Sequence, residues 1–384
     1  MEALNQDSMY SKETECVHNQ QQHQGVNTPI YTSTANRYVG YDEILYPRNF
    51  NTENQKAIVE KLCRLEKGEA GMTFSSGSAA ISTVLFSFLK AGDHALFSQE
   101  IYGGTAKLVV EEFPKFNIQF DFVPNAEMGK LDSMIRKNTK VFYTETPSNP
   151  LLSIVDLEAI SAVARKNDIL SVVDNTFATP IFQNPISLGF DVVVHSGTKY
   201  LGGHHDLCFG AIVTSQKLKD VIYQSALNFG GSLNGLDCYL IERSLKTLSL
   251  RVEKQSSNAM KLAKALQKNP AIAAVYYPGL ESHPNHAVAA RQMKGGFGGM
   301  LSFELKDASK TGKFLNRLQL IIPALSLGGV ETTVCQPSTS SHASLSEEER
   351  LKQGITDALL RLSVGIEDAD DLIQDIEAAI ASIQ

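Results

Sequence analysis

Short apolar runs alternate with longer amphipathic stretches over the first two thirds of the chain. Six of these runs are rich in valine, isoleucine and phenylalanine and are too short for helices: 95–98, 118–123, 141–144, 170–173, 192–195 and 210–213. Helical patterns separate them between about Phe50 and Ser244. Because buried parallel strands have continuous apolar runs and are joined by helices, this order predicts an α/β fold. We expect a mostly parallel sheet with helices on both faces.

The last third of the chain predicts a second, smaller α/β domain. A long helical pattern covers 244–265, apolar runs at 274–277 and 300–305 predict strands, and an amphipathic stretch at 369–383 predicts the last helix. The glycine-rich stretch 294–299 lacks the Gly-Lys-Ser/Thr of a nucleotide loop and precedes a strand. We therefore interpret it as a flexible entry to the second sheet.

The chain length and the polar opening complete the predicted domain organisation. With 384 residues the chain exceeds the ~250–300 that a single core usually reaches. We expect a cofactor-binding domain at 50–244 and a C-terminal domain at 245–384. The first residues, 1–49, are mostly polar and predict an extended arm that contacts a neighbouring subunit, with its first residues disordered.

A single lysine follows the apolar run at 192–195. Lys199 stands in the sequence Ser-Gly-Thr-Lys-Tyr, directly after the place where that strand ends. A lysine at that position is shielded from water, which lowers its pKa. It can then act as the free amine that attacks a carbonyl. Taken alone, such a lysine is more often a solvated loop residue.

A carboxylate follows the neighbouring strand in the same way. Asp174 comes directly after the run at 170–173. Alone it would be a turn or helix-cap residue. A lysine and a carboxylate at adjacent strand ends, however, match pyridoxal phosphate, which needs a Schiff-base lysine and an acidic partner for its pyridinium nitrogen.

A small-residue turn offers a place for the phosphate of that cofactor. Ser75-Ser76-Gly77-Ser78 precedes the apolar helical stretch 81–89, so free backbone N–H groups and the helix dipole point at one spot. About twenty residues later, Tyr102 stands in a glycine-rich turn, where its ring could lie on a cofactor ring. Each signal is weak alone, but together they favour the cofactor.

These residues resemble the Cys/Met metabolism family of pyridoxal phosphate enzymes: cystathionine γ-synthase, cystathionine γ-lyase, cystathionine β-lyase and methionine γ-lyase. The resemblance runs in order over nearly the whole chain. Its motifs are Tyr46-Pro47-Arg48, Ser76-Gly77, Tyr102-Gly103-Gly104-Thr105, Glu145-Thr146-Pro147-Ser148-Asn149-Pro150, Val173-Asp174-Asn175-Thr176, Ser196-Gly197-Thr198-Lys199-Tyr200, Ser326-Leu327-Gly328-Gly329 and Arg361 to Asp368. It implies the fold-type I architecture of pyridoxal phosphate transferases.

The resemblance also implies roles for individual residues. Lys199 would hold the cofactor and move protons, Asp174 would pair with the pyridinium nitrogen, and Tyr102 would stack on the ring and serve the leaving group as an acid. The phosphate would be held by Gly77, Ser78, Ser196 and Thr198, and by Tyr46 and Arg48 of a neighbouring subunit. Arg361 would bind the substrate carboxylate with help from Asn149 and Ser326, a task that suits a planar guanidinium.

Four positions bear on which member of the family the chain resembles. Ser78 stands where methionine is common, and Pro47 stiffens the arm between Tyr46 and Arg48. Gly104 stands where methionine γ-lyases usually have a cysteine, which disfavours that activity. Glu331 lies near the distal substrate pocket of the family and mildly favours a substrate with a charged amino end.

Charge and cysteine usage exclude other classes of function. The net charge of −7 and the lack of a basic stripe argue against nucleic acid and anionic membrane surfaces. The N-terminus has no secretory signal pattern, and the five scattered cysteines are typical of reduced, cytoplasmic thiols. His204-His205-Asp206 lacks a distant partner ligand, so we expect no metal. His342 is interpreted as a loop histidine, with a pocket role as the lesser alternative.

We therefore predict a cytoplasmic pyridoxal phosphate-dependent carbon–sulfur lyase or transferase. It would catalyse γ-elimination or γ-replacement on cystathionine, an O-acylhomoserine or a related sulfur amino acid. Cystathionine β-lyase or methionine γ-lyase activity is the alternative within the family. An aminotransferase and a non-catalytic homologue are alternatives of other classes. The family implies a homotetramer built from dimers with shared active sites, while the preferred substrate stays open.

Overall fold

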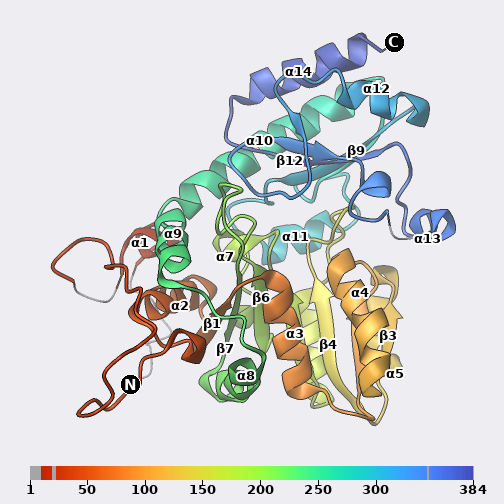
Figure 1. Ribbon diagram of the computed structural model, residues 1–384. Helices are drawn as coiled ribbons and strands as arrows, with labels where there is room; N and C mark the ends of the chain where they lie inside the picture. Colours follow the sequence, from red (N-terminus) through yellow and green to blue (C-terminus); the bar gives the residue numbers. More distant parts are fainter. Residues whose placement is uncertain (1–9, 20–22, 344–345, 384) are drawn as a thin grey trace.

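A computed structural model describes residues 10–19, 23–343 and 346–383. Two sheets dominate it, and the long helix α10 runs from the first toward the second (Figure 1). The first sheet has seven strands in the order β1-β7-β6-β5-β4-β2-β3. Its strands are β1 Ala70–Phe74, β2 His94–Ser98, β3 Gln119–Val123, β4 Thr139–Glu145, β5 Leu170–Asp174, β6 Val192–Ser196 and β7 Gly210–Thr214.

This sheet is parallel except at β7, which is antiparallel to both β6 and β1. The predicted mostly parallel sheet is therefore confirmed. All six predicted runs are strands, with ends shifted by at most two residues. The strand β1 was missed, because its five residues directly precede the small-residue turn Ser75-Ser76-Gly77-Ser78 and were not separated from it.

Helices cover both faces of the first sheet. Successive side chains of β6 point to opposite faces, and both faces are apolar. Val192 and Val194 pack in the core beneath α3, α4 and α8, whereas Val193 packs in the core beneath α5 and α6. The helices of this part are α2 Glu53–Glu66, α3 Gly77–Phe88, α4 Gly103–Glu112, α5 Leu131–Met134, α6 Leu157–Lys166, α7 Thr179–Phe182 and α8 Gln216–Phe229. Packed apolar side chains cover both faces of the sheet, so a ligand can bind only at the strand ends.

The second sheet has five strands in the order β10-β11-β12-β9-β8. They are β8 Ile272–Tyr276, β9 Met300–Leu305, β10 Ile322–Pro323, β11 Thr333–Cys335 and β12 Leu359–Ser363. Its apolar core includes side chains of α10 Leu248–Lys268, α12 Thr311–Leu315 and α14 Ala369–Ala381. The other helices of this part are α11 His286–Gln292 and α13 Glu347–Lys352. The strands predicted near 274–277 and at 300–305 correspond to β8 and β9.

The helix predicted at 244–265 is divided in the structure. Helix α9, Gly235–Leu245, ends before Thr247, and α10 begins at Leu248. The prediction of one helix beginning at Ser244 was wrong. The apolar periodicity continues across the break and therefore does not reveal it. The break is held by Arg251, whose guanidinium donates to the Ser244 carbonyl at 2.9 Å and to Thr247 Oγ1 at 3.2 Å.

In the described part of the N-terminal arm, the α-helix α1 Lys12–Val17 packs on α2 and α10. The Lys12 ammonium donates to the carbonyls of Pro180 and Ile181 at 2.6 and 2.8 Å. From residue 23 to Tyr46 the arm has no regular secondary structure. The residues expected to be disordered at the start of the chain lie outside the described ranges.

Candidate active site

A cavity of about 510 Å³ opens beyond the carboxyl ends of β4, β5 and β6. Loops of the second sheet close its other side. Most residues predicted for the site line this one cavity, namely Gly77, Ser78, Tyr102, Asn149, Asp174, Ser196, Thr198, Lys199, Ser326 and Arg361. The chain thus brings together side chains that are as far apart in sequence as Gly77 and Arg361.

Two carboxylates lie side by side at the strand ends. Parallel pairing of β4 with β5 places Glu145 opposite Asp174. Asp174 accepts a hydrogen bond from the Thr176 backbone N–H at 3.0 Å and one from the Tyr143 hydroxyl at 3.3 Å. Burial raises the pKa of Asp174, against these hydrogen bonds. A cationic ring nitrogen beside Asp174 would reverse that shift, so the site fits a protonated pyridine.

Glu145 is a site residue to which the sequence motif assigned no role. Its pKa is raised well above the usual range by burial and by the neighbouring Asp174. Its Oε2 accepts a hydrogen bond of 2.7 Å from the backbone N–H of Tyr102, directly before α4. Glu145 therefore fixes the turn that carries the half-exposed Tyr102 ring. The role was missed because it depends on the register of β4 with β5.

The phosphate cradle forms at the N-terminus of α3. Ser76 caps this helix, with its hydroxyl accepting from the Ala79 N–H at 3.1 Å. The N–H groups of Gly77 and Ser78 belong to the first turn, which has no acceptors of its own in the helix. A side chain at Gly77 would place its Cβ 2.8 Å from Ser196 Cβ and 2.9 Å from Ser196 Cα. Glycine is thus required for the close approach that forms the cradle.

Two hydroxyl residues complete the cradle from the loop after β6. The Ser196 backbone N–H donates to Thr176 Oγ1 at 2.8 Å. Thr198 forms three hydrogen bonds with Phe209: its N–H donates to the Phe209 carbonyl at 3.0 Å, its hydroxyl donates to the same carbonyl at 3.2 Å, and its Oγ1 accepts from the Phe209 N–H at 3.0 Å. These bonds hold the loop in place beside the start of α3, where Ser196 and Thr198 line the cavity.

Lys199 extends from that loop into the cavity. Its ammonium donates to Ser326 Oγ at 2.8 Å. Burial, and then the nearby Arg361 cation, lower its pKa below the usual 10.5. The sequence argument for a dry lysine at a strand end predicted this direction. A lowered pKa favours the free amine that a Schiff base requires.

Arg361 faces the cavity because of strand alternation. In β12, Leu360 and Leu362 pack into the core beneath α10 and α14, so Arg361 between them points the other way. Its guanidinium donates to Asn149 Oδ1 at 2.8 Å and to the Ser326 carbonyl at 3.4 Å.

One donor of this guanidinium is left over. Among the described residues, the buried Nε of Arg361 has no hydrogen-bond partner. A buried, unpaired donor on a cation fits a carboxylate ligand. Ser326 adopts a left-handed backbone with φ of +73°, which is uncommon for a residue other than glycine and brings both its groups toward Lys199 and Arg361.

Three predicted site residues lie outside the cavity. Arg48 donates to the Leu227 carbonyl at 2.8 Å, and its guanidinium lies 5.6 Å from the ring centre of Tyr46. Tyr46 is 39% exposed. Glu331 is on the surface, with its carboxylate 3.9 Å from His205 Nε2. The placement of these residues in the site stays a prediction.

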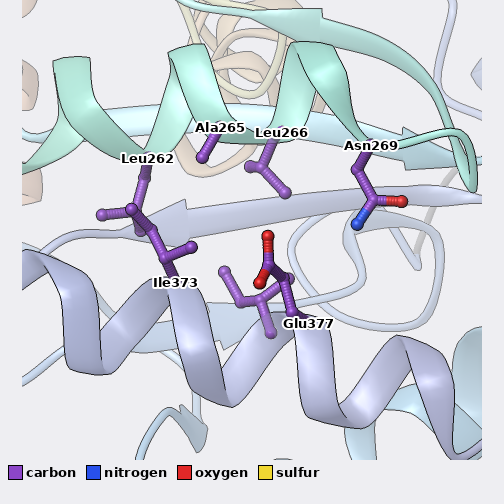
Figure 2. A pocket seen from close by; sticks show the side chains of 7 residues that line it. Leu262, Ala265, Leu266, Asn269, Ile373 and Glu377 are labelled. Carbon is purple, nitrogen blue, oxygen red and sulfur yellow. The ribbon is translucent and has the colours of Figure 1, made fainter.

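Other candidate features have simpler interpretations. A cavity of about 10 Å³ between α10 and α14 is lined mostly by apolar side chains such as Leu262 and Ile373, and it holds at most one water-sized sphere (Figure 2). No group of three or more His, Cys, Asp or Glu residues suited to a metal occurs within the described ranges. Across the same ranges, none of the helices has the length and apolar character needed to cross a membrane.

His342 is more closely tied to the site than a surface loop histidine would be. It is buried, and burial together with the Arg361 cation lowers its pKa to about 4. Its ring Nδ1 lies 2.9 Å from the Ser341 hydroxyl, and Ser341 lines the cavity. His342 thus lies beneath the substrate side of the cavity, as a neutral neighbour of Arg361.

The residues present fit pyridoxal phosphate. The cavity combines a lysine of lowered pKa, a buried carboxylate, the N-terminus of α3 packed against Ser196 through Gly77, and an arginine whose Nε has no acceptor among the described residues. These are the groups that the cofactor and an amino-acid carboxylate require.

Comparison with known proteins gives the same answer. The family model for Cys/Met metabolism PLP-dependent enzymes matches residues 13–381. A cystathionine gamma-lyase of Bacillus subtilis is 43% identical over 93% of this chain and 95% of its own length. An L-methionine gamma-lyase of Fusobacterium nucleatum is 46% identical over 85% of this chain and 83% of its own.

Further relatives include β-lyases and solved structures. The cystathionine beta-lyase MetC of Bacillus subtilis is 43% identical over 97% of both chains. A crystal structure of cystathionine gamma-lyase from Lactobacillus plantarum, complexed with L-serine, superposes with a TM-score of 0.94 at 38% identity, covering 98% of this chain and 100% of that one. The chain therefore belongs to the Cys/Met metabolism family of PLP-dependent enzymes, uses pyridoxal 5′-phosphate and is of the transsulfuration type.

Proposed function

We propose that this enzyme acts at the γ-carbon of a sulfur or O-acylated amino acid, with cystathionine as the first candidate substrate. The observation that carries the proposal is the position of Ser326, whose hydroxyl accepts from Lys199 while its carbonyl accepts from Arg361. A substrate carboxylate held by Arg361 therefore brings the amino acid's α-carbon next to the Lys199 amine. The cavity of about 510 Å³ has room for a cofactor and a small amino acid together.

Pyridoxal phosphate supplies an electron sink for negative charge that develops on the carbon atoms near the substrate amine. The protein residues do the rest. Arg361 and Asn149 would orient the substrate carboxylate, and Asp174, as an anion, would pair with the ring nitrogen of the cofactor. Lys199 would hold the cofactor and, as a free amine of lowered pKa, would take and return protons at the α- and β-carbons of the substrate. Tyr102, which lines the cavity, would protonate the leaving group.

The γ-reaction makes one demand that the β-reaction does not. It needs proton transfer at two successive carbons, so its base must reach both. Lys199 has a long flexible side chain, and among the described residues its ammonium hydrogen-bonds to Ser326 Oγ alone, which suits that movement. β-Elimination is the second candidate, because close relatives carry that name.

Methionine γ-lyase activity is a weaker candidate within the γ-class. At Gly104 a Cβ would lie 2.4 Å from Cε1 of the Tyr102 ring, so the ring occupies the space of a side chain there. In this arrangement the cavity has no thiol at position 104.

We further propose a homotetramer built from dimers that share active sites, working in the cytoplasm. Tyr46 and Arg48 are displaced from the cavity of their own chain, as residues that serve a neighbour's phosphate would be. The five cysteines are free thiols, in keeping with a reducing compartment. Mixing an Arg48→Ala chain with a Lys199→Ala chain tests sharing, because mixed dimers regain one intact site and therefore activity. Failure to regain activity in proven mixed dimers would reject it.

Product analysis tests the reaction itself. The purified enzyme, with pyridoxal phosphate bound, is incubated with cystathionine. We expect cysteine and 2-oxobutanoate, the products of γ-cleavage, whereas homocysteine and pyruvate would show β-cleavage instead. O-acylhomoserine with a thiol tests γ-replacement in parallel.

Lys199→Ala is the matched control for chemistry at this lysine. It should remove the visible absorption band of the bound cofactor and lower turnover by at least about 10³-fold, because it removes both the attachment point and the base. Wild-type protein without a cofactor band, or a Lys199→Ala variant that keeps its activity, would overturn the proposal.

A further inference from the structure

The first turns of helix α10 carry a buried arginine that the reaction does not use directly. Arg251 is 4% exposed, and burial lowers its pKa to about 10. Among the described residues, no carboxylate lies within 4.0 Å of its guanidinium. Burying a cation without a counter-ion costs free energy. We therefore expect such a cation only where its hydrogen bonds stabilise a structure that the protein needs. All three bonds go to oxygen acceptors in chain turns, at Tyr200, Ser244 and Thr247.

The bond to Tyr200 connects Arg251 to the catalytic lysine. Its Nη1 donates to the Tyr200 carbonyl at 2.8 Å, one residue after Lys199. The same turn closes with a 2.7 Å bond from the Gly203 N–H to the Lys199 carbonyl. Gly203 has φ of +72°, and any Cβ there would overlap the Arg251 guanidinium. The turn and the arginine are therefore fitted to one another.

One helical turn further along, Gln255 holds the opposite side of the site. Residues four apart lie on the same helix face, so Arg251 and Gln255 point in similar directions. Gln255 is fully buried, and its amide Nε2 donates to the Gly329 carbonyl at 2.6 Å. Gly329 belongs to the loop 326–329, which also carries Ser326. One helix thus bonds to both walls of the cavity.

The two held segments touch each other directly. At Gly328, with φ of +82°, a Cβ would lie 2.7 Å from the Tyr200 nitrogen and 2.9 Å from the Lys199 carbonyl carbon. The Gly328 N–H in turn donates to Ser363 Oγ of β12 at 2.7 Å. The Lys199 backbone is therefore held between Arg251 on one side and the loop 326–329 on the other.

We propose that Arg251 and Gln255 are positioning residues, which together set the distance between the Lys199 amine and Ser326. The inference rests on the proposed role of Lys199. Arg251 acts through the backbone of the lysine, whereas Gln255 acts through the loop that supplies Ser326 and supports Arg361. Neither contacts the cavity. Because a shift of about 1 Å at reacting atoms costs on the order of 10²-fold in rate, a loosened segment should be visible in kinetics.

The two residues should affect different kinetic constants. In Arg251→Met, we expect kcat to fall about 10- to 100-fold, KM for cystathionine to change by less than about threefold, and the visible circular dichroism of the bound cofactor to change. Arg251→Lys, which keeps a charge and one donor, should restore part of kcat and of the spectrum. In Gln255→Glu the N–H donor is replaced by an acceptor of equal size, and we expect KM to rise about tenfold with kcat nearly unchanged.

Gln267→Glu is the matched control. It makes the same substitution on the same helix, where the Gln267 amide donates to Ser282 Oγ at 2.8 Å on the surface. Its kcat, KM and spectrum should equal those of the wild type. All measurements use the cofactor-loaded enzyme, with thermal unfolding recorded for each variant.

Several outcomes would overturn the inference. It fails if Arg251→Lys and Gln255→Glu both behave as Gln267→Glu does. It also fails if activity falls only in proportion to the folded fraction, with unchanged KM and spectrum, because that is a purely structural role. If Arg251→Met does not fold, Arg251→Lys decides the first half and Gln255→Glu the second. A wild-type enzyme without bound cofactor would instead reject the proposed function.

Discussion

The two walls of the candidate active site, the proposed cofactor wall and the proposed substrate wall, are built in different ways. The cofactor wall consists of the ends of parallel strands, where Glu145 lies opposite Asp174 and the loop after β6 carries Lys199. The substrate wall consists of Arg361 on the central strand β12 and of the loop after the short edge strand β10, which includes Ser326 with its left-handed backbone. Strand register fixes the first wall through many backbone bonds, whereas a few side-chain bonds fix the second. Changes on the cofactor wall should therefore alter chemistry, and changes on the substrate wall should alter substrate binding.

The largest effect should come from the cofactor wall. We expect Asp174→Asn to bind pyridoxal phosphate but to lose about 10²- to 10³-fold in kcat, because a neutral amide does not stabilise a protonated ring nitrogen. Steady-state kinetics on cystathionine measure the loss. Asp191→Asn is the control, since Asp191 directly precedes β6, at the opposite end of that strand from the cavity, and its carboxylate accepts from Ser171. An Asp174→Asn enzyme within a few fold of wild-type kcat would contradict the assignment.

A smaller effect is expected on the substrate wall. Arg361→Lys keeps the charge but cannot bind a carboxylate through two parallel N–H groups, so KM should rise about 10- to 100-fold while kcat falls much less. The measurement is the dependence of rate on cystathionine concentration, with the exposed Arg317→Lys as the control. If the variant loses activity through a lower kcat, with KM unchanged, the proposed contrast between the two walls is wrong.

The smallest effect concerns stability in mild acid. The pKa of His342 is lowered from 6.5 to about 4 by burial and by Arg361, so the folded protein keeps this ring neutral. Below pH 6.5 the unfolded chain takes up a proton that the folded chain does not. The stabilisation from the neutral ring is thus complete above pH 6.5 and declines toward pH 4, by about 1 kcal/mol at pH 5.5.

His342→Gln should flatten this decline. Urea unfolding of the wild type and the variant at pH 7 and at pH 5.5 measures it, and the quantity compared is the change in unfolding free energy between the two pH values. Equal declines in both proteins would show that His342 does not contribute. Activity at neutral pH serves as a control for damage to the nearby cavity.

Much of the cofactor wall could be predicted because its signals are local. Val192 to His195 is a buried strand by composition, and a lysine placed just beyond it lies at the edge where ligands bind. Asp174 follows the same rule. The strand β1 was missed because its five residues merge with the small residues of the phosphate turn, and pairing with β7 alone distinguishes it.

The substrate wall could be predicted only through family resemblance. The Leu-Leu-Arg-Leu-Ser alternation of β12 is visible in the sequence, but it does not say which face meets the cavity. The role of Glu145 depends on strand register, and the break between α9 and α10 depends on Arg251 reaching back to Ser244. Neither leaves a local pattern.

By itself, the sequence determined six of the seven strands of the first sheet, the strand ends that carry Lys199 and Asp174, and the glycine turn at the start of α3. These follow from side-chain periodicity and backbone preference, which act over a few residues. Only the tertiary structure decided that Gly328 packs on Lys199, that Arg251 and Gln255 hold both walls, and that Arg361 retains an unpaired donor. Such contacts join residues far apart in the chain, and their geometry exists only when both sheets are packed together.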